Sequence, residues 1–295
     1  MYDALRIFAL TAINILFINV CAVAQERAQI NVVSRGDANA RYAIGLLSLA
    51  IEKTGKPYKI NVTRGELTTM RLTESVKTGT IDVFWAATSD ELEKELLPVR
   101  IPLEKGLLGH RIFIVHKDNR HLLDNVTTLS ELRKYTMGQG RGWTDSDILK
   151  ANGFKVVLAP KYEGLFHMVD GKRFQLFPRG VNEPFNELEL RPTLDLVVDQ
   201  NVMITYRIPY YLFITPGRPE LAKDIESGLN KAISDGSFDA YFYNDETTKA
   251  VIKQVATVKR RIFALETPSL PPKTPLDDSK LWVNFEELQK KSSNL

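Results

Sequence analysis

The sequence predicts an α/β protein of two lobes, each a mostly parallel β-sheet flanked by helices. The main observation is a repeated pattern. Residues 28–85 read as strand, helix, strand, helix, strand, and residues 136–177 run through the same order. This alternation is typical of parallel sheets, because consecutive parallel strands need a helix-length crossover between them. Two copies of the pattern therefore indicate two lobes.

Each element of the two copies follows from local signals. Short apolar runs bounded by glycine or polar turns predict strands at residues 28–33, 58–62, 81–85, 136–139, 155–158 and 173–177. Apolar residues at helical spacing predict helices at residues 41–53, 67–77, 145–152 and 162–170. Gly55, Gly79 and Gly171 follow three of these helices, and glycine is a common helix stop.

The rest of the chain supplies further elements. Apolar runs predict strands at residues 111–115, 194–198 and 201–214, the last reading as one returning strand. Helical spacing predicts helices at residues 129–134, 220–234 and 245–255. The tail from Thr267 to Pro275 holds four prolines and should be extended. Trp282 and Phe285 are expected to pack back onto a lobe.

Residues 1–24 read as an export signal that is removed from the mature chain. Arg6 precedes an apolar run, which closes on the small-x-small ending Ala22-Val23-Ala24 where a signal peptidase cleaves. Three polar residues interrupt the run, so it is too short for a membrane anchor of roughly 20 apolar residues. Lipid attachment at Cys21 is the alternative, although Val20 is larger than the residue usual before a lipidated cysteine. We therefore expect a periplasmic protein.

Composition narrows the chemistry of the mature chain. Cys21 is the only cysteine, so cleavage after Ala24 leaves no disulfide and no thiolate nucleophile. The formal net charge of +3 is too small and too evenly spread to indicate a nucleic-acid partner. None of the four histidines has the spacing of a metal site, and the sequence carries no phosphate-cradling motif. Neither a metal nor a cofactor is expected.

The candidate ligand site lies where the loops of the two copies gather. In open α/β sheets, ligands lie beyond the carboxyl ends of the strands. These loops hold arginines with bidentate donors, indoles with flat apolar faces, and short polar side chains beside helix amino termini. The candidate residues are Arg35, Asp37, Trp85, Thr88, Arg141, Trp143, Thr144 and Arg179. No residue is predicted to be catalytic.

Several candidates also have a purely structural interpretation. Arg35 and Asp37 fit a solvated ion pair in a turn, and Trp85 fits a core aromatic at a strand end. Thr144 or its neighbour Asp145 fits the N-cap of the following helix. Arg179 is near enough in sequence to pair with Glu183 or Glu187. For the two remaining residues of the second lobe, Arg141 and Trp143, the sequence suggests no such structural role.

Four segments carry a family resemblance across nearly all of residues 27–260. They are Gly79-Thr80-Ile81-Asp82-Val83, the crossing strand from Arg111 to Val115, Gly140-Arg141-Gly142-Trp143, and the return around residues 204–215. In their order and spacing the chain resembles the extracytoplasmic solute-binding proteins of ABC importers, family 3. The resemblance implies a periplasmic-binding-protein-like fold of class II, with two strands forming the hinge. Mapped onto this chain, the first lobe is residues 25–115 plus 206–295, and the second lobe is residues 116–205.

The resemblance also implies a function. A monomer of this kind captures a small polar or anionic, amino-acid-like solute between its lobes and delivers it to an ABC-type permease. One feature departs from the family, because Leu92 stands where an arginine usually clamps the ligand carboxylate. Arg100 or Arg111 is the candidate to replace it from another position, and the spacing favours neither. Two alternatives stay open: a sensor for a membrane signalling partner, and a periplasmic enzyme of the dehydratase kind.

Overall fold

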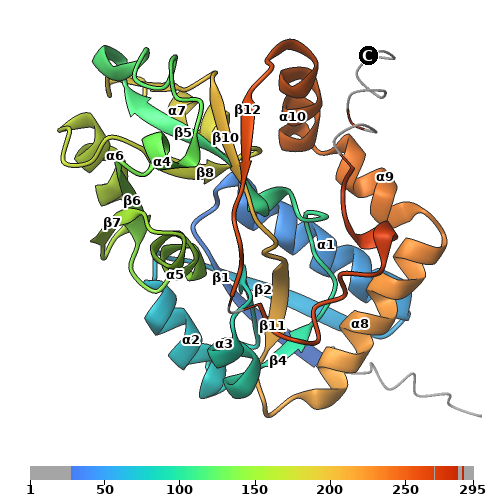
Figure 1. Ribbon diagram of the computed structural model, residues 1–295. Helices are drawn as coiled ribbons and strands as arrows, with labels where there is room; N and C mark the ends of the chain where they lie inside the picture. The colour runs from blue at the N-terminus through green and yellow to red at the C-terminus, as the bar shows by residue number, and fades with distance from the viewer. Residues whose placement is uncertain (1–27, 269, 285–287, 289–295) are drawn as a thin grey trace, which may run out of the picture.

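The computed structural model describes residues 28–268, 270–284 and 288 of the 295-residue chain. The expected export signal at residues 1–24, with Cys21, and Phe285 lie outside the described residues. The chain forms two α/β lobes, which confirms the predicted fold class (Figure 1). Of the helices within the described ranges, none combines the length and the apolar composition that a bilayer crossing requires.

The first lobe is built on five strands. They are β1 (Ala28–Ser34), β2 (Tyr58–Arg64), β3 (Val83–Ala87), β4 (Leu97–Val99) and β11 (Tyr210–Ile214). β1 and β2 pair in parallel, whereas β11 lies antiparallel between β3 and β4. The two groups are joined through Asp82: its backbone N–H donates to the Asn31 carbonyl at 2.9 Å, and its carboxylate accepts the Asn31 N–H at 2.7 Å.

Six helices accompany these strands. They are α1 (Ala38–Thr54), α2 (Thr69–Lys77), α3 (Asp90–Glu95), α8 (Pro219–Ser234), α9 (Ser237–Asn244) and α10 (Glu246–Thr257). α1 begins at Asp37, whose carboxylate accepts the Ala40 N–H at 2.8 Å, and ends at Gly55 in the left-handed region with φ 70°. α1 and α8 pack backbone to backbone, since a Cβ on Gly228 would lie 2.0 Å from the Ala50 carbonyl oxygen.

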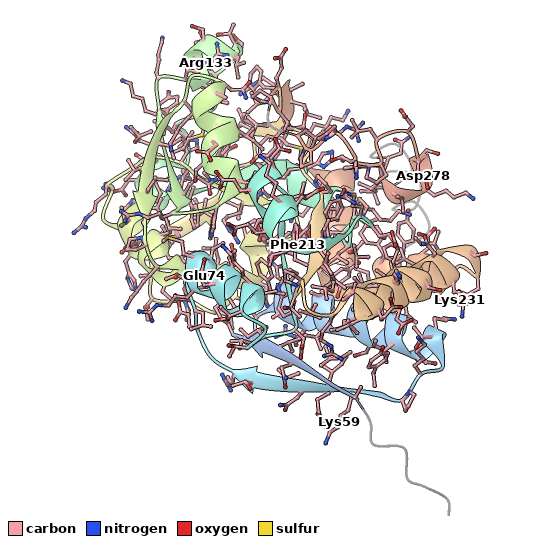
Figure 2. All side chains as sticks on the ribbon, turned by 90° about the horizontal axis from the view of Figure 1, so that it is seen from below. Lys59, Glu74, Arg133, Phe213, Lys231 and Asp278 are labelled. Carbon is pink, nitrogen blue, oxygen red and sulfur yellow. The ribbon has the colours of Figure 1, made fainter. Side chains whose placement is uncertain are left out.

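The second lobe has seven strands around β5. They are β5 (His110–His116), β6 (Thr136–Gly140), β7 (Lys155–Ala159), β8 (Phe177–Gly180), β9 (Leu196–Val198), β10 (Val202–Thr205) and β12 (Arg261–Ala264). β5 lies antiparallel to β8, β9 and β10, and β6 pairs with β7 in parallel. Its helices are α4 (Leu129–Leu132), α5 (Thr144–Ala151), α6 (Tyr162–Asp170) and α7 (Pro184–Glu189). Figure 2 places Arg133 of this lobe far from Lys59, which lies on β2 of the first lobe.

The sheets are mixed, which corrects the expectation of mostly parallel sheets. Some strands enter each lobe from the other lobe and so run against their neighbours: β5 comes from the first lobe, and β11 returns from the second. The single returning strand expected over residues 201–214 is in fact two strands, β10 and β11. Pro209 lies at the break, and its missing N–H and fixed φ disfavour a continuous strand.

A third segment crosses between the lobes besides the two expected hinge strands. β12 pairs in parallel with β10 of the second lobe, although residues 206–295 were all expected in the first lobe. Beyond β12 the chain runs back, and Leu281 and Trp282 pack against the core of the first lobe. The expected packing of Trp282 is therefore confirmed. Three segments of the described chain connect the two lobes.

The contact between α1 and α8 gives a test of how the first lobe is held together. Gly228→Ala places a methyl group against the Ala50 backbone, which cannot move aside as a flexible side chain would. We expect a loss of about 1–3 kcal/mol in the free energy of unfolding. Urea denaturation of the variant and the native protein measures this loss.

Gly164→Ala in α6 is the matched control, because nothing lies within 4 Å of the Cβ it would add. Alanine is the better helix former by about 1 kcal/mol, so this variant should be neutral or slightly stabilised. Equal effects of the two substitutions would contradict the close packing of α1 on α8.

Candidate functional site

A cavity of about 160 Å³ lies between the two lobes. The loops that follow β1, β3, β6 and β8 all contribute to its lining, as expected from the strand ends. Six of the eight candidate residues line it: Arg35, Asp37, Trp85, Trp143, Thr144 and Arg179. Thr88 and Arg141 are not among its lining residues. Thr88 is buried and its hydroxyl donates to Glu93 at 2.8 Å, while Arg141 is exposed.

Arg35 lines the cavity and uses only one of its three nitrogens in a hydrogen bond within the described residues. Its Nε donates to the Asp37 carboxylate at 3.0 Å, and its guanidinium lies 4.5 Å from the centre of the Tyr162 ring. Within the described part of the chain, its two terminal nitrogens make no hydrogen bond. The ion pair expected in this turn is therefore present, and it leaves two N–H-bearing nitrogens at the cavity.

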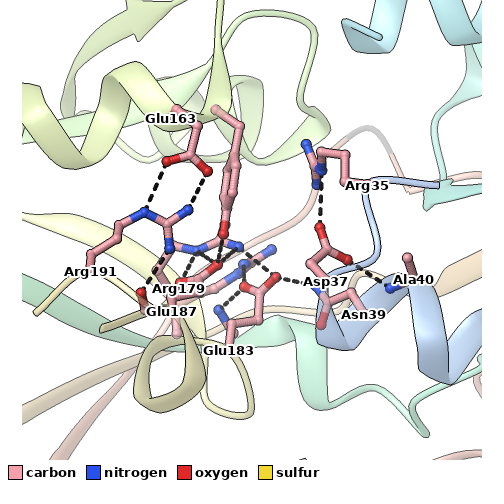
Figure 3. A network of polar contacts seen from close by, with 12 residues as sticks. Arg35, Asp37, Asn39, Ala40, Glu163, Arg179, Glu183, Glu187 and Arg191 are labelled. Atoms are coloured by element: carbon pink, nitrogen blue, oxygen red, sulfur yellow. Dashed lines mark hydrogen bonds and ion pairs between the residues drawn. The ribbon is translucent and has the colours of Figure 1, made fainter. Parts of the chain in front are cut away.

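Arg179 pairs with both carboxylates expected as its alternative partners. Its Nη2 donates to Glu183 at 2.7 Å and to Glu187 at 2.6 Å, and its Nε donates to Glu187 at 2.9 Å (Figure 3). Arg179, Glu183 and Glu187 are all buried. Tyr162 adds a fourth member, since its hydroxyl donates to Glu187 at 2.6 Å. This network fixes the floor of the cavity on the side of the second lobe.

Arg111 forms a second buried network at the start of β5. Its guanidinium pairs with Asp145 and lies 3.3 Å from Glu183. The Tyr206 hydroxyl also donates to Asp145, at 2.6 Å. Arg111 is 2% exposed, and its Nε has no partner within the described residues. Through Glu183, the networks of Arg111 and Arg179 form one continuous buried cluster of charge.

Three contacts cross the cavity from one lobe to the other. The Asn39 amide donates to Glu183 at 2.7 Å, as Figure 3 shows, and the Thr144 hydroxyl donates to the Ala87 carbonyl at 3.3 Å. Arg35 of the first lobe stacks on Tyr162 of the second. Such direct contacts require the lobes to be close together. The structure therefore represents the closed arrangement.

Trp143 supplies an apolar wall and also begins α5. It is the N-cap residue, one position before the expected Thr144, and its side chain makes no capping hydrogen bond. Its indole packs over Gly140, where a Cβ would lie 2.3 Å from the ring. Its ring centre is 6.4 Å from that of Tyr162. The amino terminus of α5 thus reaches the cavity without a side chain that satisfies its first N–H groups.

Glu104 lies buried beside this cluster. One of its carboxylate oxygens has no partner within the described ranges. Burial raises the pKa of Glu104 to about 8, and the nearby Glu183 carboxylate adds to the shift, while Asn182 and Arg111 oppose it. The group therefore holds a proton in the folded protein at a pH where an exposed glutamate is ionised.

Several polar or aromatic residues that line the cavity are not among the sequence candidates. They include Asn39, Arg111, Asp145, Tyr162, Glu183 and Tyr210. Arg111 and Glu183 were noticed only as substitutes or partners for other residues. Nothing in the sequence near Asn39 indicates that it meets Glu183, 144 positions away. Only the closed arrangement of the lobes brings these two side chains together.

No family model and no curated protein matches the sequence, but solved structures match its fold. An ancestral arginine-binding protein bound to arginine matches with a TM-score of 0.56 and 18% identity, over 75% of this chain and 99% of that one. The chain has the two-lobed fold of binding proteins. A histidine kinase sensor domain with similarity to periplasmic binding proteins matches with a TM-score of 0.55 and 16% identity, over 75% of this chain and 96% of that one.

An enzyme precursor has the same binding-protein fold. It is an ancestral amino-acid-binding protein described as a precursor of cyclohexadienyl dehydratase. The match has a TM-score of 0.54 and 16% identity, over 74% of this chain and 95% of that one. The likeness in fold therefore extends to an amino-acid-binding protein, a sensor domain and the precursor of an enzyme.

The raised pKa of Glu104 predicts how stability depends on pH. The unfolded chain releases this proton near the ordinary glutamate pKa, whereas the folded protein keeps it up to about pH 8. Stability is thus lost as the pH rises through this window. Glu104→Gln cannot ionise, so it should not lose stability in this way. Between about pH 5 and pH 8, the free energy of unfolding of the variant should therefore rise relative to that of the native protein by a few kcal/mol, since one pKa unit corresponds to about 1.4 kcal/mol.

Urea denaturation at several pH values measures this difference. Glu66→Gln is the control, because Glu66 is exposed and should give a curve parallel to that of the native protein. A Glu104→Gln curve that also runs parallel to the native one would show that Glu104 titrates alike in both states.

Proposed function

We propose that the chain is an exported solute-binding protein that closes its lobes around a small polar or anionic, amino-acid-like solute. The observation that carries this proposal is the cavity between the lobes, lined by guanidinium, carboxylate and aromatic groups from both sides. Its volume of about 160 Å³ is roughly ten times the minimum that holds one water molecule. A small molecule fits such a space, and a polymer does not.

The anionic end of the solute is proposed to meet Arg35 and the amino terminus of α5. The free terminal nitrogens of Arg35 suit a carboxylate, which accepts two parallel N–H donors. The uncapped start of α5 at Trp143 and Thr144 adds backbone N–H groups that favour an anion. In this proposal Arg35 takes the part of the carboxylate clamp that Leu92, which also lines the cavity, cannot play.

The cationic end is proposed to meet the carboxylates on the same walls. Three guanidinium groups line the cavity, those of Arg35, Arg111 and Arg179. Three carboxylates line it as well, those of Asp37, Asp145 and Glu183. This balance favours a solute that carries both signs of charge over a simple anion, because every lining arginine already has a carboxylate partner. Trp85 and Trp143 would cover its apolar part.

Delivery to an ABC-type permease is the role we propose for the closed, liganded form, acting as a monomer. Closure joins the surfaces of both lobes, and a solute that contacts both favours that state by its differential affinity. Sensing for a membrane signalling partner is the second candidate, since the likeness to a histidine kinase sensor domain is about as strong. Recovery of the bound compound unchanged would argue against the third class, an enzyme.

A thermal-shift screen of residues 25–295 tests the proposal. The compounds are amino acids, short peptides, organic acids and sugars, and calorimetry follows on each hit. Binding to the folded state alone must raise the melting temperature by mass action. We expect hits among zwitterionic amino acids. We also expect Arg35→Ala to weaken binding by about tenfold to a hundredfold, since a hydrogen bond to a charged group contributes roughly 1.5–3 kcal/mol.

Arg141→Ala is the matched control, because Arg141 is exposed and does not line the cavity. A larger loss of affinity with Arg141→Ala than with Arg35→Ala would move the site to the original candidate in the second lobe. A flat screen of well-folded protein would count against solute binding itself.

A further inference from the structure

The third crossing segment is anchored in the cores of both lobes. Leu265, just after β12, is buried in the core of the second lobe. Leu281 is buried in the core of the first lobe. In Figure 1 this segment runs down from β12 and then turns across the first lobe toward α8 and α9. It is a third connection beside the two hinge connections, residues 100–109 between β4 and β5 and residues 206–209 between β10 and β11. Any change in the angle between the lobes therefore has to be accommodated by this segment as well.

The tail is hydrogen-bonded to the first hinge connection at Lys105. Lys105 and Gly106 both have positive φ, at 48° and 79°, immediately before the chain enters the second lobe. The Lys105 carbonyl accepts the Val283 N–H at 2.7 Å, and its ammonium group donates to the Lys280 carbonyl at 2.6 Å. The same ammonium group pairs with Asp239 of α9 at 2.7 Å. A sharp bend in the hinge is thus fixed to the tail from both its backbone and its side chain.

Trp282 contacts both hinge connections. Its ring packs on Gly106, in the turn between β4 and β5, so closely that a Cβ there would lie 2.5 Å from the indole. Arg207, in the irregular segment between β10 and β11, places its guanidinium 5.1 Å from the centre of the same ring. The indole Nε1 donates to the Pro275 carbonyl at 2.8 Å, which fixes the ring in the tail. One side chain therefore contacts both connections about which the lobes would rotate.

A cavity of about 1020 Å³ lies beside this contact, lined by Lys105, Gly106, Arg207 and Trp282 among others. It shares no lining residue with the cavity between the lobes. Because a hinge moves by changes in φ and ψ at a few residues, a well-placed group against those residues can set its angle.

We propose that residues 278–283, with Trp282 at their centre, form a wedge that holds the hinge at the closed angle in the absence of any ligand. The wedge can contact both hinge connections only while Gly106 and Arg207 keep their present positions relative to each other. Opening the lobes must pull Gly106 and Arg207 away from the indole or displace the tail from Lys105. The wedge thereby sets the resting equilibrium between open and closed molecules, whatever the cavity between the lobes binds.

The distance between the lobes in ligand-free protein tests this wedge. Spin labels are placed on cysteines at Glu74 of α2 and Asp147 of α5, which are 66% and 75% exposed and belong to different lobes. Pulsed electron resonance then gives the distribution of distances. For the native tail we expect most molecules at the closed distance and a small open population. For Trp282→Ala we expect a larger population at longer distance, with the ratio of open to closed molecules raised about tenfold or more.

Leu276→Ala is the control, since Leu276 belongs to the same tail and is 45% exposed. It should leave the distribution unchanged, and Trp282→Phe should restore much of the closed population. If Trp282→Ala fails to fold, Arg207→Ala removes the other partner of the same contact. Because Arg207 is exposed, this variant should fold, and it should shift the distribution in the same direction. Identical distributions in folded native and variant protein, or a native protein already open, would overturn the wedge. Neither result bears on solute binding, which the thermal-shift screen measures separately.

Discussion

The carboxylate of Glu183 is the group on which the closed arrangement depends. It accepts hydrogen bonds from Arg179 and from the Gly180 N–H within the second lobe, lies beside Arg111 of β5, and accepts the Asn39 amide of the first lobe. Removing one partner of a buried ion pair typically costs about 3–5 kcal/mol, so these donors are what allow the charge to be buried. The same carboxylate thus joins the chemistry of the cavity to the position of the lobes.

This arrangement affects how a solute is recognised. The lining arginines are paired with carboxylates of the chain itself, so a bound solute has to offer contacts better than those that these side chains already make with one another. A solute with both signs of charge disturbs the internal pairs least, since each of its ends adds to an existing pair. Arg35 is the most available group, because its terminal nitrogens are free and it is stacked on Tyr162 of the opposite lobe.

Two independent sets of contacts bear on the angle between the lobes. On the side of the cavity, Asn39 and Arg35 of the first lobe contact Glu183 and Tyr162 of the second. Away from that cavity, Trp282 contacts Gly106 and Arg207, one in each hinge connection. The first set would change when a solute enters, whereas the second is built into the tail. The balance between open and closed forms is therefore a property of the whole chain as well as of its ligand.

Local patterns in the sequence were enough to predict most helices and strands and the general location of the site. Periodicity and glycine stops are local signals, so helices such as α1 and α6 and most strands were predicted within a few residues. The rule that ligands lie beyond strand ends brought six of the eight candidates to one cavity. Arg35 and Arg179 also proved to have the ion-pair partners that their neighbours in sequence suggested.

The directions of the strands and the contacts between distant side chains follow from how the two lobes pack, and local patterns do not encode them. Strand direction depends on which lobe the chain comes from, and a local apolar pattern is the same for a parallel and an antiparallel strand. The contacts of Asn39 with Glu183 and of Trp282 with Gly106 join residues 144 and 176 positions apart. No local pattern encodes such pairs, because they arise from the packing of whole lobes. The charge balance of the cavity and the wedge on the hinge are both results of that packing.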